Sequence, residues 1–458
     1  MWTELPTVES CVPCVAPYSF FFDLVATHWR TSESNRRTLH RICTLARKQG
    51  AQFVASESAF SREDVRNELD LLDEFMGGGG AAEAVAFSFF ATDANPKDDI
   101  QAIEESSLLG TLVLINYRAP AETDFTHSYI YEAVLRPPTY RSDNGRRNPL
   151  LNNFISADGE VRRSVLKREF LLRGIYYAQQ NSETHVCAHA CLRMALNSIA
   201  VQGEPLASDA INRVLKIVPP FAGLELEQIR SFIDQTGAVR ASIVQCDDDL
   251  TYANFLTILA AIVESGHVAL LVFTTGDPEV QHVVTVFGFT RNSDEWHPEA
   301  LPAYSGPLSS RYHPAAFWID HFLIHDDNFG PYFAFNSRAL EFDEKIRARW
   351  IIALHPICPP TRPDAVEGLA ATLLSNVLPS LASVGNGRWF EMMTQGQLQY
   401  VLRTVLIQRD RYLQHLRGSI CHAGTKLTAA EISEFADLGV GSKSTDTSWS
   451  SGASFVCI

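Results

Sequence analysis

The order of helical and strand patterns between residues 187 and 354 constrains the fold more than any other feature of the chain. Apolar residues at helical spacing come first, and short runs rich in β-branched residues follow. We expect helices at 187–200, 207–217, 224–236 and 251–265, and strands at 240–246, 267–274, 281–289, 316–325 and 349–354. Helices followed by strands that pair as antiparallel neighbours predict an α+β domain with its helices packed on a sheet.

A cysteine stands where an irregular loop turns into the first of these helices. The loop covers residues 179–186, and the apolar stripe of Ala190, Met194 and Leu196 follows Cys187. The N–H groups and the dipole of a helix start favour a nearby anion, so a thiol at this point carries more thiolate. Cys187 is therefore a candidate nucleophile, whereas Cys191, one turn later, is better explained by packing.

A cysteine nucleophile needs a histidine base that a third group holds in place. His282 opens a β-branched run at 282–289, and Asp326 ends the next strand in an acidic turn. If the two strands are antiparallel neighbours, the start of one lies beside the end of the other, so Asp326 can orient His282. Asp327 is the alternative to Asp326 in this role.

Other histidines compete with His282 for the role of base. They are His267, His321 and His325. None of them is followed by an alternating run that closes on glycine and an aromatic residue, so we prefer His282.

These residues resemble the papain-like cysteine peptidases, and most closely the branch that removes double-glycine leader peptides from bacteriocins. Members carry Gln, a short spacer and Cys-Gly-x-Ala-Cys/Ser-Leu, then His-Phe-Val-Val-x-x-Gly-Tyr, then a strand ending in Asn-Asp-Pro. The corresponding segments here are CAHACL at 187–192, HVVTVFGF at 282–289 and HDD at 325–327. The resemblance covers roughly residues 170 to 355 and implies a papain-like catalytic domain.

The resemblance also implies a mechanism and the residues that carry it. Cys187 would attack a peptide or isopeptide carbonyl, His282 would take and return the proton, and Asp326 would hold the imidazole. Gln180 would help the backbone N–H of Cys187 to stabilise the oxyanion of the acyl-transfer intermediate. The substrate would be a peptide or protein, and no cofactor would be needed.

Three positions differ from the family pattern. Ala188 replaces a glycine, Asp327 stands where proline is common, and Gln180 is one residue further from Cys187 than the family glutamine, which leaves Gln179 as an alternative. These differences keep two other functions open. One is a catalytically weak or inactive papain-like scaffold that serves as a binding or sensor module, and the other is an acyl transferase on the same fold.

Composition and cysteine spacing argue against several other functions. The net charge of −15 argues against nucleic acid as a partner. No apolar run reaches bilayer length and the N-terminus lacks a signal-peptide pattern, so we expect a cytoplasmic protein without a membrane partner. Nine cysteines, an odd number, favour free thiols. Cys11 and Cys14 have zinc-knuckle spacing without a second close pair, so we expect no metal.

Four parts are expected along the chain. They are an N-terminal α/β region at 1–165, the papain-like cysteine peptidase domain at 166–358, a helical C-terminal extension at 359–438 and a flexible tail at 439–458. Turn-rich segments at 137–149 and 356–363 suggest the boundaries. In the first part, residues 18–75 read as largely helical and 111–117 and 128–135 as strands; in the extension, 364–381 and 395–416 show helical spacing. The N- or C-terminal region could recruit a protein partner.

Overall fold

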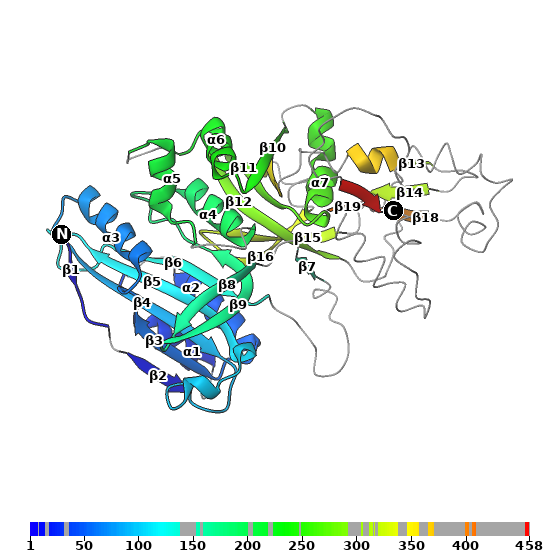
Figure 1. Cartoon of the computed structure of the whole chain (residues 1–458). Coiled ribbons are helices and arrows are strands. Elements are labelled where there is room, and N and C mark those ends of the chain that lie inside the picture. Colours follow the sequence, from blue (N-terminus) through cyan, green and yellow to red (C-terminus); the bar gives the residue numbers. More distant parts are fainter. Residues whose placement is uncertain are drawn as a thin grey trace, which may run out of the picture.

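The computed structural model describes most of the chain as far as residue 356 and short segments beyond it. The described residues are 1–7, 9–13, 18–31, 36–137, 153–155, 159–199, 205–218, 223–246, 249–291, 304–305, 311–314, 316, 319–337, 346–356, 365–370, 399–402, 405–408 and 454–457. They form a mixed α and β structure built around two main antiparallel sheets (Figure 1).

The first sheet comes from the N-terminal part of the chain. Its strand order is β2-β3-β4-β5-β6-β9-β8, and β1 pairs with β4 in parallel. The strands are β1 (Thr3–Glu4), β2 (Ser10–Pro13), β3 (Phe53–Ser58), β4 (Ala81–Phe90), β5 (Leu108–Arg118), β6 (His127–Leu135), β8 (Gly159–Val165) and β9 (Arg168–Tyr177). Short 3-10 turns, η1 (Ile100–Ala102) and η2 (Glu105–Ser107), lie between β4 and β5.

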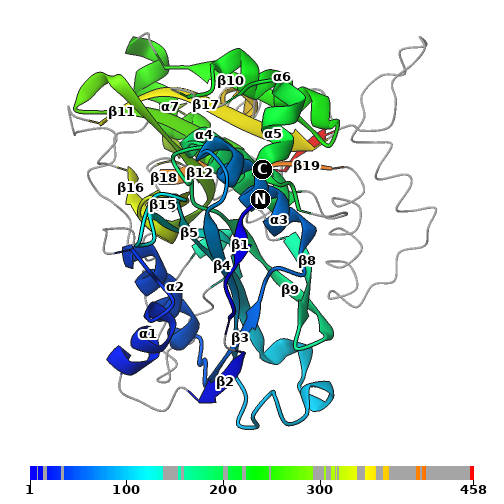
Figure 2. The same ribbon diagram turned by 90° about the vertical axis from the view of Figure 1, so that its left-hand side faces the viewer.

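Helices cover both faces of this first sheet (Figure 2). They are α1 (Tyr18–Ala26), α2 (Arg36–Lys48) and α3 (Glu63–Phe75). Apolar residues of α3 pack on one face with residues of β4, β5 and β6, whereas α1 and α2 contribute to the core on the other face. The sheet is therefore buried on two sides, which explains why β5 reads as an almost continuous buried run.

The second sheet has the order β10-β17-β11-β12-β15-β16, and β7 pairs with β12. Its strands are β7 (Asn153–Ile155), β10 (Val239–Gln245), β11 (Val268–Thr275), β12 (Asp277–Arg291), β15 (Ile319–Asp326), β16 (Gly330–Asn336) and β17 (Ile346–Pro356). The helices of this part are α4 (Cys187–Ile199), α5 (Ser208–Leu215), α6 (Leu226–Thr236) and α7 (Asp249–Glu264). Helix α4 shares a core with one face of the sheet, and α7 shares a core with the other.

Two smaller sheets, one of three strands and one of two, are also among the described residues. They are formed by β13 (Tyr304–Ser305), β14 (Arg311–Pro314) and β18 (Gln399–Leu402), and by β19 (Val405–Gln408) with β20 (Ser454–Cys457). Within the described ranges, no helix combines the length and the apolar character that crossing a bilayer requires.

Helix α4 packs against both main sheets, and all of its residues from Ala188 to Ser198 are buried. Its one charged side chain, Arg193, is fully buried, because its guanidinium donates hydrogen bonds to Tyr131 O (3.1 Å) and Tyr176 Oη (2.9 Å). The guanidinium carbon also lies 4.4 Å from the ring centre of Tyr131. A buried cation must be paired and hydrogen-bonded to be tolerated, so Arg193 attaches α4 to the first sheet.

The expected elements between 187 and 354 are confirmed, but the sequence prediction missed several strands. Residues 18–75 are not helical throughout, because β3 interrupts them, and β4, β8, β9 and β16 were not predicted. The helical prediction for 395–416 is wrong where the structure describes it, since 399–402 and 405–408 are strands. Val, Ile and Tyr suit a pleated surface there, and the pairing partners lie far away along the chain.

The expected boundary at residue 165 lies inside the β8–β9 hairpin. Strand β9 also pairs with β6, and one apolar core continues from α1 through α4 into β17. The four-part division stays a prediction. The strand pairing and the shared core described above both cross its first boundary. Residues 138–149, most of the loop that suggested a boundary, lie outside the described residues. Within 359–458, only 365–370, which is helical, and the three short strands are described.

Replacing Arg193 with methionine should destabilise the fold. The substitution keeps most of the side-chain volume but removes the buried charge that faces Glu68 and Glu132. It also leaves the buried oxygens of Tyr131 and Tyr176 without their donor, and each such loss costs about 1–3 kcal/mol, so urea unfolding should show a loss of at least about 2 kcal/mol. The control is Arg213→Met on α5, whose side chain is 71% exposed and should change stability by less than about 1 kcal/mol. Equal effects of the two substitutions would contradict this role for Arg193.

Candidate active site

Asn181 shapes the loop that precedes α4. Its side-chain oxygen accepts hydrogen bonds from the backbone N–H groups of Glu183 (3.0 Å), Thr184 (2.9 Å) and His185 (3.3 Å). Its side-chain nitrogen donates to Glu68 on α3 at 3.0 Å. A short polar side chain that bonds to the backbone ahead of it is a typical way to fold a tight turn. This network, which sequence reasoning missed, determines where α4 starts and therefore where Cys187 lies.

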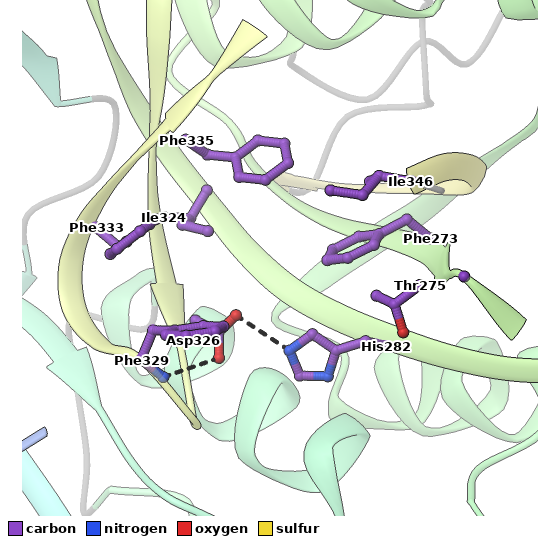
Figure 3. Close-up of a pocket in the computed structure, with 10 residues that line it drawn as sticks. Phe273, Thr275, His282, Ile324, Asp326, Phe329, Phe333, Phe335 and Ile346 are labelled. Atoms are coloured by element: carbon purple, nitrogen blue, oxygen red, sulfur yellow. Dashed lines mark hydrogen bonds and ion pairs between the residues drawn. The ribbon is translucent and has the colours of Figure 1, made fainter. Parts of the chain in front are cut away.

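His282 and Asp326 face each other across neighbouring antiparallel strands, β12 and β15, as expected (Figure 3). His282 Nε2 lies 3.1 Å from Asp326 Oδ2. The other carboxylate oxygen of Asp326 accepts the backbone N–H groups of Asn328 (2.8 Å) and Phe329 (3.2 Å) in the turn after β15. The turn therefore holds the carboxylate, and the carboxylate holds the imidazole.

The Cys187 side chain makes a hydrogen-bonding interaction with the same histidine. Burial by itself lowers the pKa of His282, but the hydrogen bonds to Asp326 and Cys187 and the nearby carboxylates raise it to about 10. Cys187 is partly exposed, whereas Cys191 is fully buried, and burial raises the pKa of the Cys191 thiol. The structure thus brings Cys187, His282 and Asp326 together and leaves Cys191 in the core.

Asp327 is a second carboxylate beside the imidazole. Its Oδ1 lies 3.8 Å from His282 Nε2, and its side chain is fully buried. Burial, together with the charge of Asp326, raises the pKa of Asp327 to about 7, although the charge of His282 acts in the opposite direction. Asp326 is the closer partner of His282 by 0.7 Å, the difference between 3.8 and 3.1 Å. The geometry therefore favours Asp326 as the orienting residue.

The two glutamines before α4 have different surroundings. Gln179 is buried: its Oε1 accepts the N–H of Ile130 at 2.9 Å, and its Nε2 donates to Asp327 O at 3.0 Å. These bonds make Gln179 a structural link between β6 and the acidic turn. Gln180 is half-buried, and its side chain has no hydrogen-bond partner among the described residues. Of the two, Gln180 is the one whose amide is available to a ligand.

The competing histidines are engaged elsewhere. His325 is fully buried against Tyr176 O at 3.2 Å, and burial lowers its pKa to about 3. His267 pairs with His355 at 2.8 Å near the ends of β11 and β17. His321 lies 3.3 Å from the Thr290 hydroxyl. None of these three contacts involves Cys187.

One group of side chains in the described structure has ligand types that suit a metal ion. His282, Asp326 and Asp327 each offer one ligand atom, and these atoms lie within 4.8 Å of one another. Imidazole and carboxylate are common zinc ligands. The same atoms form the hydrogen bond that orients His282 toward Cys187, so a bound cation would compete with that orientation.

Neither family models, nor curated proteins, nor solved structures show a significant match to this chain. The function of this chain is therefore inferred from the geometry of the site itself.

The pH dependence of the unfolding free energy should reveal the interaction between His282 and Asp326. A histidine has a pKa of about 6.5 in an unfolded chain, so a folded value near 10 stabilises the protein fully below pH 6.5 and progressively less as the pH rises toward 10. Asp326→Asn removes the charge that raises the pKa. From pH 6.5 to 10 the wild type should therefore lose more unfolding free energy than the variant, by at least about 1 kcal/mol.

Urea denaturation at the two pH values measures this difference, and titrating groups away from the site cancel because both proteins contain them. Because the pKa of Asp327 depends on Asp326, both proteins also carry Asp327→Asn. Equal losses in the two proteins would show that Asp326 does not hold the imidazolium.

Proposed function

We propose that this protein is a cysteine hydrolase that cleaves a peptide or isopeptide bond on a papain-like scaffold. The observation that carries the proposal is the convergence of two side chains on His282: Asp326 lies 3.1 Å from its Nε2, and a hydrogen bond with Cys187 is among the causes of its raised pKa. The three residues come from a helix start and from two paired strands. A nucleophile beside a base that is itself held by a third group is the arrangement that activates a thiol for covalent catalysis.

In the proposed reaction the Cys187 thiolate attacks the carbonyl carbon and forms a tetrahedral intermediate. His282, as imidazolium, donates its proton to the leaving nitrogen, the C–N bond breaks and a thioester remains on Cys187. Water then attacks the thioester while His282 takes its proton, and the acid and free thiolate are released. The raised pKa of His282 supports the imidazolium form that the first step requires.

Two donors are proposed for the oxyanion. The backbone N–H of Cys187 lies in the first turn of α4, where the helix itself does not use it. The Gln180 amide would be the second donor, which its half-buried position and unengaged side chain support. Each such donor is worth about 3–4 kcal/mol of transition-state stabilisation.

We also propose that the protein works in a reducing compartment such as the cytoplasm, where the thiol stays available. Cys11, Cys187 and Cys191 are free thiols in the structure. Asn181 lies nearer than Gln180 to the position at which the family carries its glutamine. Its side chain is hydrogen-bonded to Glu68 and to the backbone of Glu183. This observation favours the binding or sensor module as the second candidate.

Labelling with iodoacetamide at pH 6 separates the two candidates. A thiol with an ordinary pKa of about 8.5 is almost wholly protonated at this pH, whereas a thiolate beside an imidazolium reacts. Cys187 should be labelled at least about tenfold faster than Cys11, which is also partly exposed. Fast labelling should vanish in Cys187→Ala and persist in Cys191→Ala, as peptide mass mapping would show. Similar rates at Cys187 and Cys11 would favour the binding module.

The two glutamines should separate catalysis from stability. Gln180→Ala should slow acylation by an activated ester by about 10²–10³-fold without changing the urea midpoint. Gln179→Ala should instead lower stability by about 1–3 kcal/mol, because it leaves the buried Ile130 N–H without a partner. Stopped-flow acylation and urea unfolding measure the two effects. An unchanged acylation rate in Gln180→Ala would remove this residue from the oxyanion site.

A further inference from the structure

A cavity of about 420 Å³ adjoins the candidate triad. Its walls are mainly apolar and include four phenylalanines, Phe273, Phe329, Phe333 and Phe335. Figure 3 shows these rings on strands β11 and β16 and on the turn between β15 and β16, with His282 and Asp326 at one end. Its volume falls within the range of about 300–1,000 Å³ that ligand pockets have, and such pockets combine apolar walls with a few polar groups.

The cavity lies on one particular side of the site. His282 and Asp326 line it, whereas Cys187 does not. The imidazole of His282 is therefore part of the cavity wall, and the Cys187 side chain is not. In the proposed reaction His282 donates its proton to the leaving nitrogen, so the part of the substrate attached to that nitrogen is the part that lies against His282.

The charges around the cavity suit the product that leaves from this side. After cleavage the leaving group is an amine, which takes up a proton and becomes a cation in water. Asp326 and Asp327 lie 3.1 and 3.8 Å from His282 Nε2, and the residues that line the cavity include no lysine or arginine. Once His282 has given its proton to the leaving nitrogen, the imidazolium no longer neutralises these carboxylates, and they favour a cationic group at this end of the cavity.

The aromatic rings leave room for a flat apolar group. Phe273 and Phe335 are stacked with centroids 6.1 Å apart, and Phe329 and Phe333 form a tilted pair at 5.7 Å. Phe329 is 53% exposed, an unusual exposure for a large apolar side chain beside a cavity. Aromatic rings interact favourably with another ring placed between or beside them.

We propose that this cavity binds an aromatic or large apolar side chain on the amine half of the substrate, in the residue that follows the cleaved bond. This inference rests on the proposed function, since it takes Cys187 as the point of acylation. The cavity would make the enzyme selective for the leaving group and, in the reverse direction, for the amine that accepts the acyl group.

Aminolysis of the acyl-enzyme tests the proposal. Cys187 is acylated with the p-nitrophenyl ester of acetylglycine, and phenylalaninamide or alaninamide is added at equal concentration. The amine nitrogen attacks the thioester carbonyl, its proton passes to His282, the C–S bond breaks and Cys187 leaves as thiolate. Phenylalaninamide should capture the acyl group at least about tenfold more efficiently, because it buries a ring in the cavity. Chromatography of the amide and acid products gives the ratio.

Variants link the preference to the cavity. In Phe329→Ala and in Phe335→Ala the preference for phenylalaninamide should fall toward one. Phe329 is largely exposed, so its truncation tests the cavity even if Phe335→Ala folds poorly. The matched control is Phe125→Ala, a partly buried phenylalanine in the turn between β5 and β6 that does not line the cavity, and it should keep the preference.

The outcomes separate the two proposals. Equal capture of both amines by a competent acyl-enzyme would overturn the cavity assignment and leave the hydrolase proposal standing. Failure to acylate Cys187 would overturn the proposed function. In that event, binding of 2-phenylethylamine to Cys187→Ala, followed by NMR shifts of Phe329 and compared with ethylamine, decides the cavity by itself. Tighter binding of the aromatic amine supports the cavity as an amine site, and equal binding overturns it.

Discussion

The burial of α4 between the two sheets is the constraint on which the rest of the structure depends. A helix that is enclosed on all sides must be apolar nearly all round, and this one carries a single charged residue, Arg193, whose cost is offset by hydrogen bonds and aromatic faces on β6 and β9. Only the two end residues of α4, Cys187 and Ile199, are not buried, and Cys187 is the one of the two with a polar side chain. The same packing holds Cys191 against the Val283 carbonyl at 3.2 Å, which makes its thiol part of the core and not of the chemistry.

Two carboxylates and one imidazole share a small, mostly buried volume next to this helix start. Two carboxylates so close to each other are not both stable as anions without a cation. Their charges raise the pKa of His282, and burial together with the charge of Asp326 raises the pKa of Asp327 to about 7. The environment therefore shifts the pKa values of these groups away from their ordinary values, as it does in sites that use general acids and bases. Asp326 is held by the N–H groups of its own turn, so its partner His282 is fixed in orientation before any substrate arrives. The proposed hydrolase would need such preorganisation, because a fixed imidazole requires no rearrangement in the transition state.

The N-terminal part of the chain supports the acidic turn from behind. Tyr177 on β9 donates to the carbonyls of Asp326 (3.2 Å) and Asp327 (3.3 Å), and Gln179 donates to the latter as well. Arg41 on α2 donates to the Pro331 and Tyr332 carbonyls of β16, and Tyr332 donates to Leu135 O on β6 at 2.7 Å. These contacts join residues that are up to about 290 positions apart along the chain. The first sheet therefore helps to hold the acidic turn and β16 in position at the site.

The sequence by itself determined the local parts of this protein: the helix that starts at Cys187, the β-branched strand that starts at His282 and the strand that ends at Asp326. These follow from periodicity and from the residues that begin and end elements, which act over a few positions. Only the tertiary structure decided what depends on distant pairing. The links from Asn181 to α3 and from Gln179 to β6 were not recognisable, because these partners lie far away along the chain. The aromatic cavity could not be foreseen either, since β16 was not predicted and its rings meet Phe273 only when β11, β12, β15 and β16 are aligned side by side. The free energy of such contacts comes from burial between elements. The residue pattern of one segment does not identify which other segment will pack against it.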